Sequence, residues 1–158
     1  MADVADKAVT RRRALASGWI MLGEAAFEQV VARSLPKGDA LSLAEFAGIQ
    51  GAKQTANLLP LCHPLALNRV AVRTVARPRE HAIEVLCYAD IAARTGVEME
   101  ALCGATLALL TIWDLAKPVN PALEVTQARL LYKSGGKQGE WTHPDGLSSE
   151  AKAFLDAH

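Results

Sequence analysis

The sequence predicts one α+β domain, and three observations support this. The segments follow the order strand, two helices, hairpin, long helix, strand, which is typical of helices packed on one face of a mostly antiparallel sheet. A chain of 158 residues is long enough to bury one core. Half of the residues are hydrophobic but only 5% are aromatic, so aliphatic side chains and alanine must fill that core. The order of elements favours a ferredoxin-like arrangement, with residues 1–140 as the domain and 141–158 as a C-terminal extension.

The first elements follow a short polar arm. Residues 1–10 show no periodicity and predict a flexible segment. A strand is expected from Arg12 to about Leu22, because an apolar run rich in β-formers follows Gly18. Residues 23–33 then predict a helix. Its apolar stripe is expected to contain Phe27, Val30 and Val31.

A second helix is predicted from the capping residue Asp39 to about Asn57, since an aspartate side chain accepts orphan N–H groups of a first turn. The small residues Gly48 and Gly51 allow another backbone to approach closely, and tight helix–sheet packing is the expected reason. One face of this helix carries Leu43, Phe46, Ala47 and Gln50.

A hairpin and the longest helix come next. Residues 65–76 alternate, and residues 82–92 supply the partner strand after a turn over 77–81. The first strand is expected to place Leu65, Leu67, Val70, Val72 and Val75 on one side. Residues 97–117 predict a long helix. Its expected buried stripe is Met99, Leu102, Cys103, Thr106, Leu109, Leu110 and Trp113.

A last strand is predicted over residues 123–132, and it leads into a glycine-containing loop bounded by Lys133 and Lys137. The composition changes after Gly139. The extension is expected to be either disordered or a short helix from Ser148, with Ala151, Phe154 and Leu155 on one side.

Composition and charge exclude several classes of function. The formal net charge is zero, so the chain lacks the overall basic footprint of a nucleic-acid-binding protein. The cluster Arg11, Arg12 and Arg13 is interpreted as a solvated strand start. The longest apolar run, residues 105–113, is too short to span a bilayer, and no signal peptide is recognisable, so no membrane association is predicted. Three dispersed cysteines fit reduced thiols and a cytoplasmic protein.

Residues 53–65 concentrate polar groups in an otherwise apolar run. Pro60 and Pro64 restrict their own backbones and those of the residues before them, so a helix cannot continue through this segment. A rigid turn is expected to present Leu61, Cys62 and His63. His63 could equally be a histidine whose hydrogen bonds are satisfied at a helix-to-strand corner. No metal site is expected, because Cys62 and His63 are adjacent rather than at ligand spacing.

Several lysines lie at the ends of predicted elements, and two of them lie in glycine-containing loops. Ammonium groups and free loop N–H groups together suit a polyphosphate. No Walker or dinucleotide fingerprint is present. The alternative is that most are surface lysines, and that Asp114 and Lys117 form an ordinary helical ion pair. The lysines concerned are Lys37, Lys53, Lys117, Lys133 and Lys137.

Several long motifs in a fixed order make a family resemblance specific. They cover roughly residues 3–139 and resemble the cyclic pyranopterin monophosphate synthase family, the C protein of molybdenum cofactor biosynthesis. The motifs are Lys37-Gly38-Asp39, residues 47–50 with Lys53, residues 59–65 around Leu61-Cys62-His63, residues 95–102 from Thr95 to Leu102, residues 113–117 from Trp113 to Lys117, and residues 129–137 from Arg129 to Lys137. Asp3, Val4, Lys7, Thr10 and Arg12 also fit the start of that family.

The resemblance implies a lyase without a cofactor. Its substrate would be (8S)-3',8-cyclo-7,8-dihydroguanosine 5'-triphosphate, a cyclised dihydro-GTP, which is rearranged to cyclic pyranopterin monophosphate with loss of pyrophosphate. The implied fold is ferredoxin-like, assembled as a homohexamer (a trimer of dimers) with active sites at subunit interfaces. The implied catalytic groups are Asp114, Lys117 and Lys37. The substrate-binding groups match Leu61, Cys62, His63, Met99, Glu100 and Lys133, and we add Arg12 and Lys53.

Some positions depart from the family pattern, but none removes an expected catalytic group. Glu45 replaces a frequent arginine, Gly51 a usual alanine, and Ala5 a usual serine, while Ala116 and Pro118 flank Lys117. One alternative function is a catalytically impaired nucleotide-binding regulator of the same fold. Another is a ferredoxin-like RNA-binding module, which zero net charge and the lack of exposed aromatic pairs on the strands disfavour.

Overall fold

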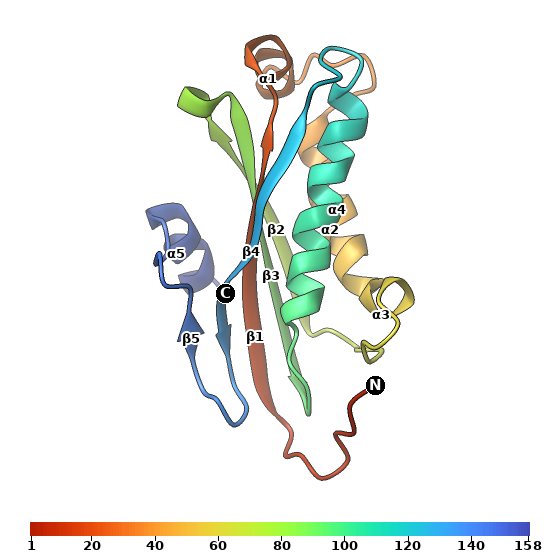
Figure 1. Ribbon diagram of the computed structural model, residues 1–158, viewed down its shortest axis with the longest axis vertical. Coiled ribbons are helices and arrows are strands. Elements are labelled where there is room, and N and C mark those ends of the chain that lie inside the picture. Colours follow the sequence, from red (N-terminus) through yellow and green to blue (C-terminus); the bar gives the residue numbers. More distant parts are fainter.

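A computed structural model describes all of residues 1–158 and confirms an α+β fold. Its core is an antiparallel sheet with strand order β2-β3-β1-β4-β5, which fits a ferredoxin-like arrangement with one added edge strand (Figure 1). The central strand β1 pairs with β3 from Thr10↔Ala93 to Met21↔Ala82. The strands are β1 (Thr10–Met21), β2 (Arg69–Arg77), β3 (Ala82–Ala93), β4 (Glu124–Ser134) and β5 (Trp141–Thr142).

Two helices, α2 and α4, cover one face of the sheet and lie side by side (Figure 1). Asp39 caps α2 as predicted, because its Oδ1 accepts from the backbone N–H groups of Leu41 and Ser42 at 3.1 and 3.2 Å. The helices are α1 (Glu24–Val31), α2 (Ala40–Lys53), α3 (Thr55–Leu58), α4 (Glu98–Ala116) and α5 (Ser149–Asp156), with a 3-10 turn η1 (Pro78–Glu80) in the hairpin.

Glycines form the contact between α2 and α4. A Cβ on Gly48 would lie 3.0 Å from the carbonyl oxygen of Gly104, and a Cβ on Gly51 would lie 2.9 Å from the Cβ of Leu107. The predicted close approach is therefore present. We expected these glycines to allow close packing of the helix on the sheet. The structure shows that the backbone nearest to them belongs to α4.

The buried stripe predicted for the long helix is correct at Leu109 but wrong at several other positions, and the apolar face predicted for α2 is exposed in the same way. In α2 the expected face is exposed at Leu43 and Phe46, which are 45% and 73% exposed. In α4 the expected stripe is exposed at Met99 and Leu110. Small residues fill the buried positions instead. These are Ala40, Ala44, Gly48, Gly51 and Ala52 in α2, and Ala101, Gly104, Ala105 and Ala108 among those of α4.

The second face of the sheet is covered by α5, which corrects the prediction that helices pack on one face only (Figure 1). The predicted helix is present, with Ser148 as its cap at 3.1 Å from the Ala151 N–H. Ala151, Phe154 and Leu155 face the sheet as expected. They form a second apolar cluster with Leu15, Leu86, Tyr88, Leu131 and Tyr132.

Several boundaries differ from the prediction. The helix expected to reach Asn57 is interrupted at Gln54, which separates α2 from α3. The hairpin strand begins at Arg69 rather than at residue 65, and Val75 packs against the α5 cluster rather than beside Val72. In α1, Val31 is exposed although Phe27 and Val30 are buried.

By length and composition alone, α4 is long and apolar enough to cross a membrane. The apolar run of residues 105–113, which we considered too short to span a bilayer, is therefore only part of a longer apolar helix. Half of that apolar segment is buried inside the protein, and a core helix of a globular domain passes the same test.

Candidate functional site

Three charged side chains meet at the C-terminal end of α4. Lys37 lies in the loop before α2, while Asp114 and Lys117 are one helical turn apart. The Asp114 carboxylate accepts from Lys37 Nζ at 3.0 Å through Oδ2 and from Lys117 Nζ at 2.7 Å through Oδ1. Lys37 Nζ also donates to the backbone oxygen of Asp114 at 3.2 Å. The structure thus brings together all three predicted catalytic residues.

The electrostatics of this Lys37–Asp114–Lys117 cluster follow from its contacts. Hydrogen bonds from Lys117 and then Lys37 lower the pKa of Asp114 below its usual value. All three side chains are about half exposed. Exposed ion pairs add little to stability, so the fold does not need this arrangement. Chemically, one carboxylate holds two ammonium groups where a small molecule could reach them.

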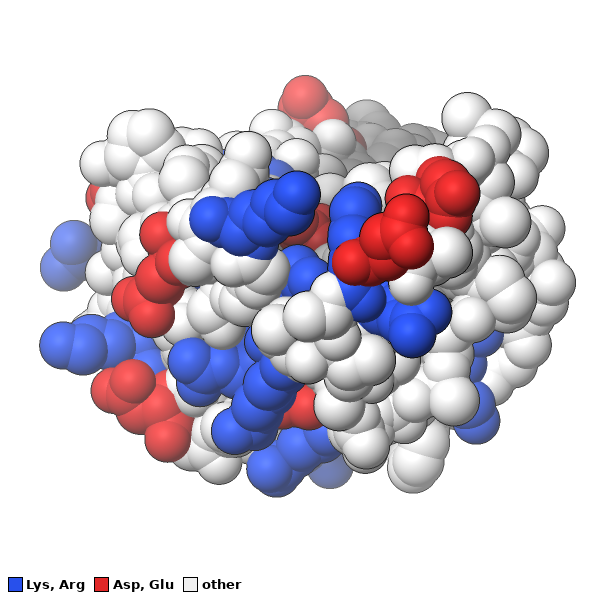
Figure 2. Space-filling model, turned by 90° about the horizontal axis from the view of Figure 1, so that it is seen from below, with Lys and Arg blue, Asp and Glu red and all other residues white.

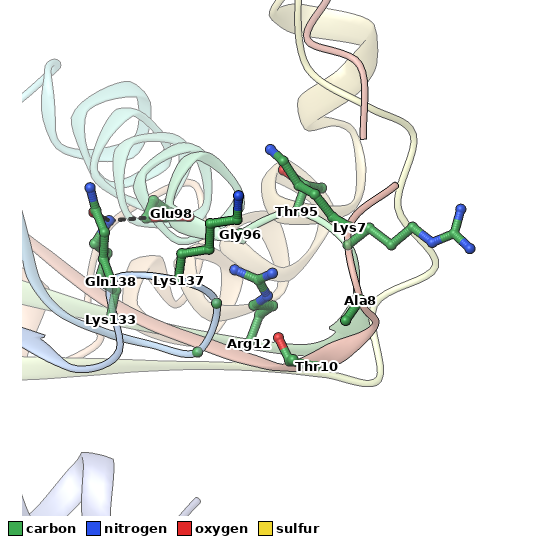
Figure 3. Close-up of a pocket in the computed structure, with 13 residues that line it drawn as sticks. Lys7, Ala8, Thr10, Arg12, Thr95, Gly96, Glu98, Lys133, Lys137 and Gln138 are labelled. Atoms are coloured by element: carbon green, nitrogen blue, oxygen red, sulfur yellow. Dashed lines mark hydrogen bonds and ion pairs between the residues drawn. The ribbon is translucent and has the colours of Figure 1, made fainter. Parts of the chain in front are cut away.

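A basic cavity of about 500 Å³ lies at the opposite end of the molecule, near the start of α4. Lys and Arg side chains gather at this end when it is seen from below (Figure 2). Lys7, Arg12, Lys133 and Lys137 point into or around the cavity from three segments of the chain (Figure 3). Of its 13 lining residues only one is hydrophobic, which suits a strongly hydrated anion.

Two features suggest that this basic cavity is built to hold a ligand. The Thr10 hydroxyl and the Arg12 Nε are buried and have no hydrogen-bond partner. Lys133 is held by Glu98 at 3.2 Å (Figure 3). The loop after β4 requires glycine, because a Cβ on Gly135 would lie 2.2 Å from the backbone oxygen of Arg11 and the φ angle is +97°.

A smaller cavity of about 110 Å³ lies beside α3 and the first turn of α4. Lys53, His63 and Glu100 line it. Glu100 is only 4% exposed, and burial raises its pKa. Burial also raises the pKa of the Cys62 thiol, with a further contribution from the charge of Glu100. The cavity combines a carboxyl group, an imidazole and an ammonium group.

The predicted substrate-binding residues are divided between these cavities. Arg12 and Lys133 line the basic cavity, whereas His63 and Lys53 line the smaller one. Glu100 also lines the smaller cavity, whereas Leu61, Cys62 and Met99 line neither. Leu61 and Met99 are 71% and 40% exposed. The combination of a fixed histidine with a glycine-rich, lysine-bearing loop predicts that His63 and Lys133 together hold the anionic end of the substrate, with help from the loop up to Lys137. The structure contradicts this within one chain, because the two residues line different cavities.

The Lys37–Asp114–Lys117 cluster is remote from both cavities within one chain. The two sets of residues lie at opposite ends of α4 (Figure 1). A helix of 19 residues is about 28 Å long at 1.5 Å per residue. No single small molecule of nucleotide size can contact both ends of one chain.

Sequence reasoning missed Arg94 and Gln138 as cavity residues. Arg94 directly precedes the Thr95-Gly96 break, so its place at a strand end was a usable signal. Its convergence with the N-terminal arm was not visible in the sequence, because the arm has no regular pattern. No group of three or more His, Cys, Asp or Glu side chains is arranged to hold a metal ion.

Comparisons with known proteins show the family of this chain. Residues 1–136 match the MoaC family. The chain is 46% identical over 144 residues to a cyclic pyranopterin monophosphate synthase of Herpetosiphon aurantiacus, covering 91% of this chain and 88% of that protein. It is 45% identical to a protein of the same name from Rhodospirillum rubrum, covering 90% and 86%. It is also 46% identical to part of a molybdenum cofactor biosynthesis bifunctional protein of Synechococcus elongatus, covering 91% of this chain and 45% of that protein.

Proposed function

The chain belongs to the MoaC family, and on that premise we propose that it is a cyclic pyranopterin monophosphate synthase. The reaction converts the cyclised dihydro-GTP into cyclic pyranopterin monophosphate and pyrophosphate, with no net redox change. It serves molybdenum cofactor biosynthesis, and we propose a cytoplasmic location. The names of the relatives favour an enzyme over a regulator that has lost its chemistry. We assign the chemistry to residues 1–140 and treat 141–158 as an extension.

The cluster of Lys37, Asp114 and Lys117 is the observation that carries the proposal. The residues come from two segments that are 77 positions apart, yet each ammonium group lies within 3.0 Å of the Asp114 carboxylate. Bond rearrangement with proton transfer needs positioned donors and acceptors. The two lysines are placed to exchange protons with substrate, while Asp114 orients both.

The triphosphate is proposed to lie in the basic cavity. Arg12 and Lys133 would donate to phosphate oxygens, with help from Lys137 and from the glycine loop. Each charge-assisted hydrogen bond of this kind contributes about 1.5–3 kcal/mol. The buried unpartnered Thr10 hydroxyl and Arg12 Nε would gain partners when the anion binds. Lys133 would then exchange Glu98 for phosphate.

His63, Lys53, Cys62 and Glu100 are proposed to contact the part of the substrate that adjoins the triphosphate. Glu98 and Glu100 are two residues apart in the first turn of α4, so the two cavities are neighbours. Leu61 and Met99 would contribute apolar contacts at the rim. This replaces the shared anion site of His63 and Lys133 with two adjoining subsites.

A complete site is proposed to need two copies of the chain. The helical positions of Met99, Thr106, Leu110 and Lys117 fall on one stripe of α4, and Met99 and Leu110 are exposed. If a two-fold axis crosses the middle of this stripe, the start of one α4 meets the end of the other. Each active site then receives the catalytic cluster from one copy and the two cavities from its partner.

Exposed apolar side chains support this assembly, although they do not set its size. Phe46, Leu58 and Leu61 are 73%, 60% and 71% exposed, and large exposed apolar side chains are typical of surfaces that bind a partner when they form a patch. The number six, as a trimer of dimers, rests on the family resemblance alone. Sedimentation at micromolar concentration tests it, and a monomer would refute the composite site.

The function is tested by incubating the protein with the cyclised dihydro-GTP and measuring pyrophosphate. Lys117→Ala and Lys37→Ala should lower turnover by at least about a hundredfold, the lower bound for general acid–base catalysis. A folded Lys117→Ala protein with wild-type turnover would contradict the assignment.

Mixed oligomers test the composite site separately. Lys117→Ala and Lys133→Ala should each be nearly inactive alone. When they are unfolded and refolded together, one site of each mixed pair contains neither change, so about a quarter of wild-type activity should return for random pairing. Failure of the mixture to exceed the separate variants would show that both groups act within one chain.

A further inference from the structure

The loop between β4 and β5, residues 135–139, forms a large part of the wall of the basic cavity. We call it the glycine loop, because Gly135, Gly136 and Gly139 occupy it, all with positive φ angles. A glycine-rich segment loses much conformational freedom when it is fixed in one shape. Of the 13 residues that line the cavity, five come from this loop and the end of β4, namely Lys133, Gly135, Gly136, Lys137 and Gln138. The shape of the cavity therefore depends on what holds the loop.

The C-terminal extension closes the glycine loop from its far side (Figure 1). β5 pairs with β4 in an antiparallel register that places Trp141 opposite Lys133. The contact continues past β5, because the His143 backbone N–H donates to the Leu131 carbonyl oxygen at 2.8 Å. The glycine loop is thus the closed end of a hairpin, and Lys133 belongs to the strand pair next to it.

A series of side-chain hydrogen bonds ties both ends of the glycine loop to the central strand. The Arg13 guanidinium donates to the Tyr132 hydroxyl at 2.9 Å, and that hydroxyl donates to the Glu140 carboxylate at 3.0 Å. Arg13 also donates to the Ser134 hydroxyl at 3.1 Å. On β1, Arg13 follows Arg12, which lines the basic cavity. The two residues that flank the loop are therefore connected to the strand that supplies Arg12.

The extension is itself anchored by α5 on the second face of the sheet. Phe154 is buried there, and the Arg73 guanidinium lies over its ring at 4.9 Å from the centroid. The Arg77 guanidinium donates to the Glu150 carboxylate at 2.9 Å. The family match covers residues 1–136, so the extension lies beyond the matched part of the chain. The anchoring of the loop is a feature that this match does not supply.

We propose that the C-terminal extension is a positioning element, which holds the glycine loop, and with it Lys133 and Lys137, in the shape that binds an anion. The proposal rests on the proposed function in assigning the triphosphate of the substrate to the basic cavity. A loop that is already ordered loses little further entropy when the ligand arrives, so binding is tighter. No residue of 141–158 lines the cavity, so the extension acts through the loop and not on the substrate.

Two substitutions at His143 isolate the backbone contact. His143→Pro removes the N–H that donates to Leu131, whereas His143→Ala keeps it and removes only the imidazole. In amide hydrogen exchange, the glycine loop should exchange faster in His143→Pro than in His143→Ala, because local opening becomes easier. In calorimetry with inorganic tripolyphosphate, the probe for the anion site, His143→Pro should bind about fivefold or more weakly than His143→Ala.

Turnover separates a positioning role from general damage. The cluster of Lys37, Asp114 and Lys117 lies at the other end of α4 and is left unchanged by both substitutions. His143→Pro should therefore raise KM for the cyclised dihydro-GTP about fivefold relative to His143→Ala, while kcat stays within about twofold, as expected when only binding is lost.

A matched pair at Glu140 tests the side-chain link. Glu140→Gln and Glu140→Ala remove the same negative charge, but only glutamine keeps an acceptor oxygen for the Tyr132 hydroxyl. Tripolyphosphate should bind about twofold or more weakly to Glu140→Ala than to Glu140→Gln, the effect of one hydrogen bond. In a Tyr132→Phe background this difference should disappear, because the donor is absent.

Equal loop exchange and equal tripolyphosphate affinity in His143→Pro and His143→Ala would overturn the proposal. Faster loop exchange with unchanged anion affinity would overturn it as well, since the order of the loop would then not affect binding. If His143→Pro does not fold, the Glu140 pair decides, and equal affinities of its two members refute the proposal. Failure of the proposed function looks different: wild type would release no pyrophosphate, but the differences in exchange and in tripolyphosphate binding would remain.

Discussion

Where α2 and α4 pack inside the protein, their inner faces carry small side chains, whereas their solvent-facing outer faces carry large apolar ones. In most globular domains the large apolar side chains are buried. The inner face is lined by glycine and alanine, so that Gly48 faces the backbone of Gly104 across a very short distance. The outer face carries Phe46 and Leu110, which remain 73% and 50% exposed. In an isolated domain the large apolar residues would be buried. The inner face allows close helix packing, and the exposed apolar outer face fits the proposed contact with another chain.

The substitution with the largest expected effect on assembly and turnover is on the outer face of α2. Phe46→Glu places a carboxylate where a second copy is proposed to pack, and a charge buried without a partner is strongly unfavourable. The oligomer should dissociate while the circular dichroism of the fold is kept. Because each site is proposed to need two copies, turnover should fall by at least about a hundredfold.

Sedimentation and pyrophosphate release measure these two effects. Val31→Glu is the matched control, since Val31 is also exposed but lies on α1. A Phe46→Glu protein that remains oligomeric with full turnover would mean that the outer face of α2 is not an interface.

The second effect concerns the inner face. Gly51→Val adds a branched side chain where a Cβ would already lie 2.9 Å from the Cβ of Leu107 and 3.0 Å from the carbonyl oxygen of Cys103. Overpacking of this kind costs about 1–3 kcal/mol of unfolding free energy. Gln50→Val, one position away and exposed, should cost under about 0.7 kcal/mol, the range of helix propensity. Denaturant unfolding compares the two, and equal losses would show that the contact between the helices is not tight.

The two faces also show how far the sequence predicts this protein. The strands, the cap at Asp39 and the long helix followed from local rules that depend on neighbouring residues. Which face of α2 is buried could not be predicted in this way, because an apolar pattern looks the same for a core as for an interface. The sequence placed Leu43 and Phe46 on one face of the helix, and the structure exposes that face at both residues.

The site shows the same division. The pairing of Asp114 with Lys117 was predictable, because the two residues are one turn apart on a helix. The approach of Lys37 was expected only from the family resemblance. The separation of His63 from Lys133 was not predictable, since it depends on how the turn after α3 lies relative to the end of β4. Relations set by tertiary geometry are absent from local patterns.

A third prediction uses Glu100, the one charged residue among the buried positions of α4. Burial raises its pKa, so the folded state holds a proton more tightly than the unfolded state. The stability this provides is complete below the unfolded pKa and is lost as the pH rises through the folded value. Glu100→Gln should therefore have a higher unfolding midpoint than wild type at pH 8 and a similar midpoint at pH 4. A constant difference across this range would show that the carboxyl does not titrate differently in the two states.

The smallest expected change in stability is at Asp114, on the outer face of α4. Its pKa is lowered by hydrogen bonds from Lys117 and Lys37, so its ionised form is favoured by folding. That contribution is present above the unfolded pKa and is lost as the pH falls through the folded value. Since the carboxylate is exposed, Asp114→Asn should shift the thermal midpoint at pH 7 by less than Gly51→Val, and the shift should disappear in acid.

The same substitution separates stability from catalysis at this position. The asparagine side chain has nearly the same shape as aspartate but cannot hold two ammonium groups by charge. Turnover should therefore fall by at least about a hundredfold while the fold, the oligomer and the binding of tripolyphosphate are retained. A large loss of stability together with unchanged turnover would reverse the argument, because the Lys37–Asp114–Lys117 cluster would then be a structural contact. In that case the outer face of α4 would serve assembly alone, and the catalytic groups would have to lie at the other end of the helix.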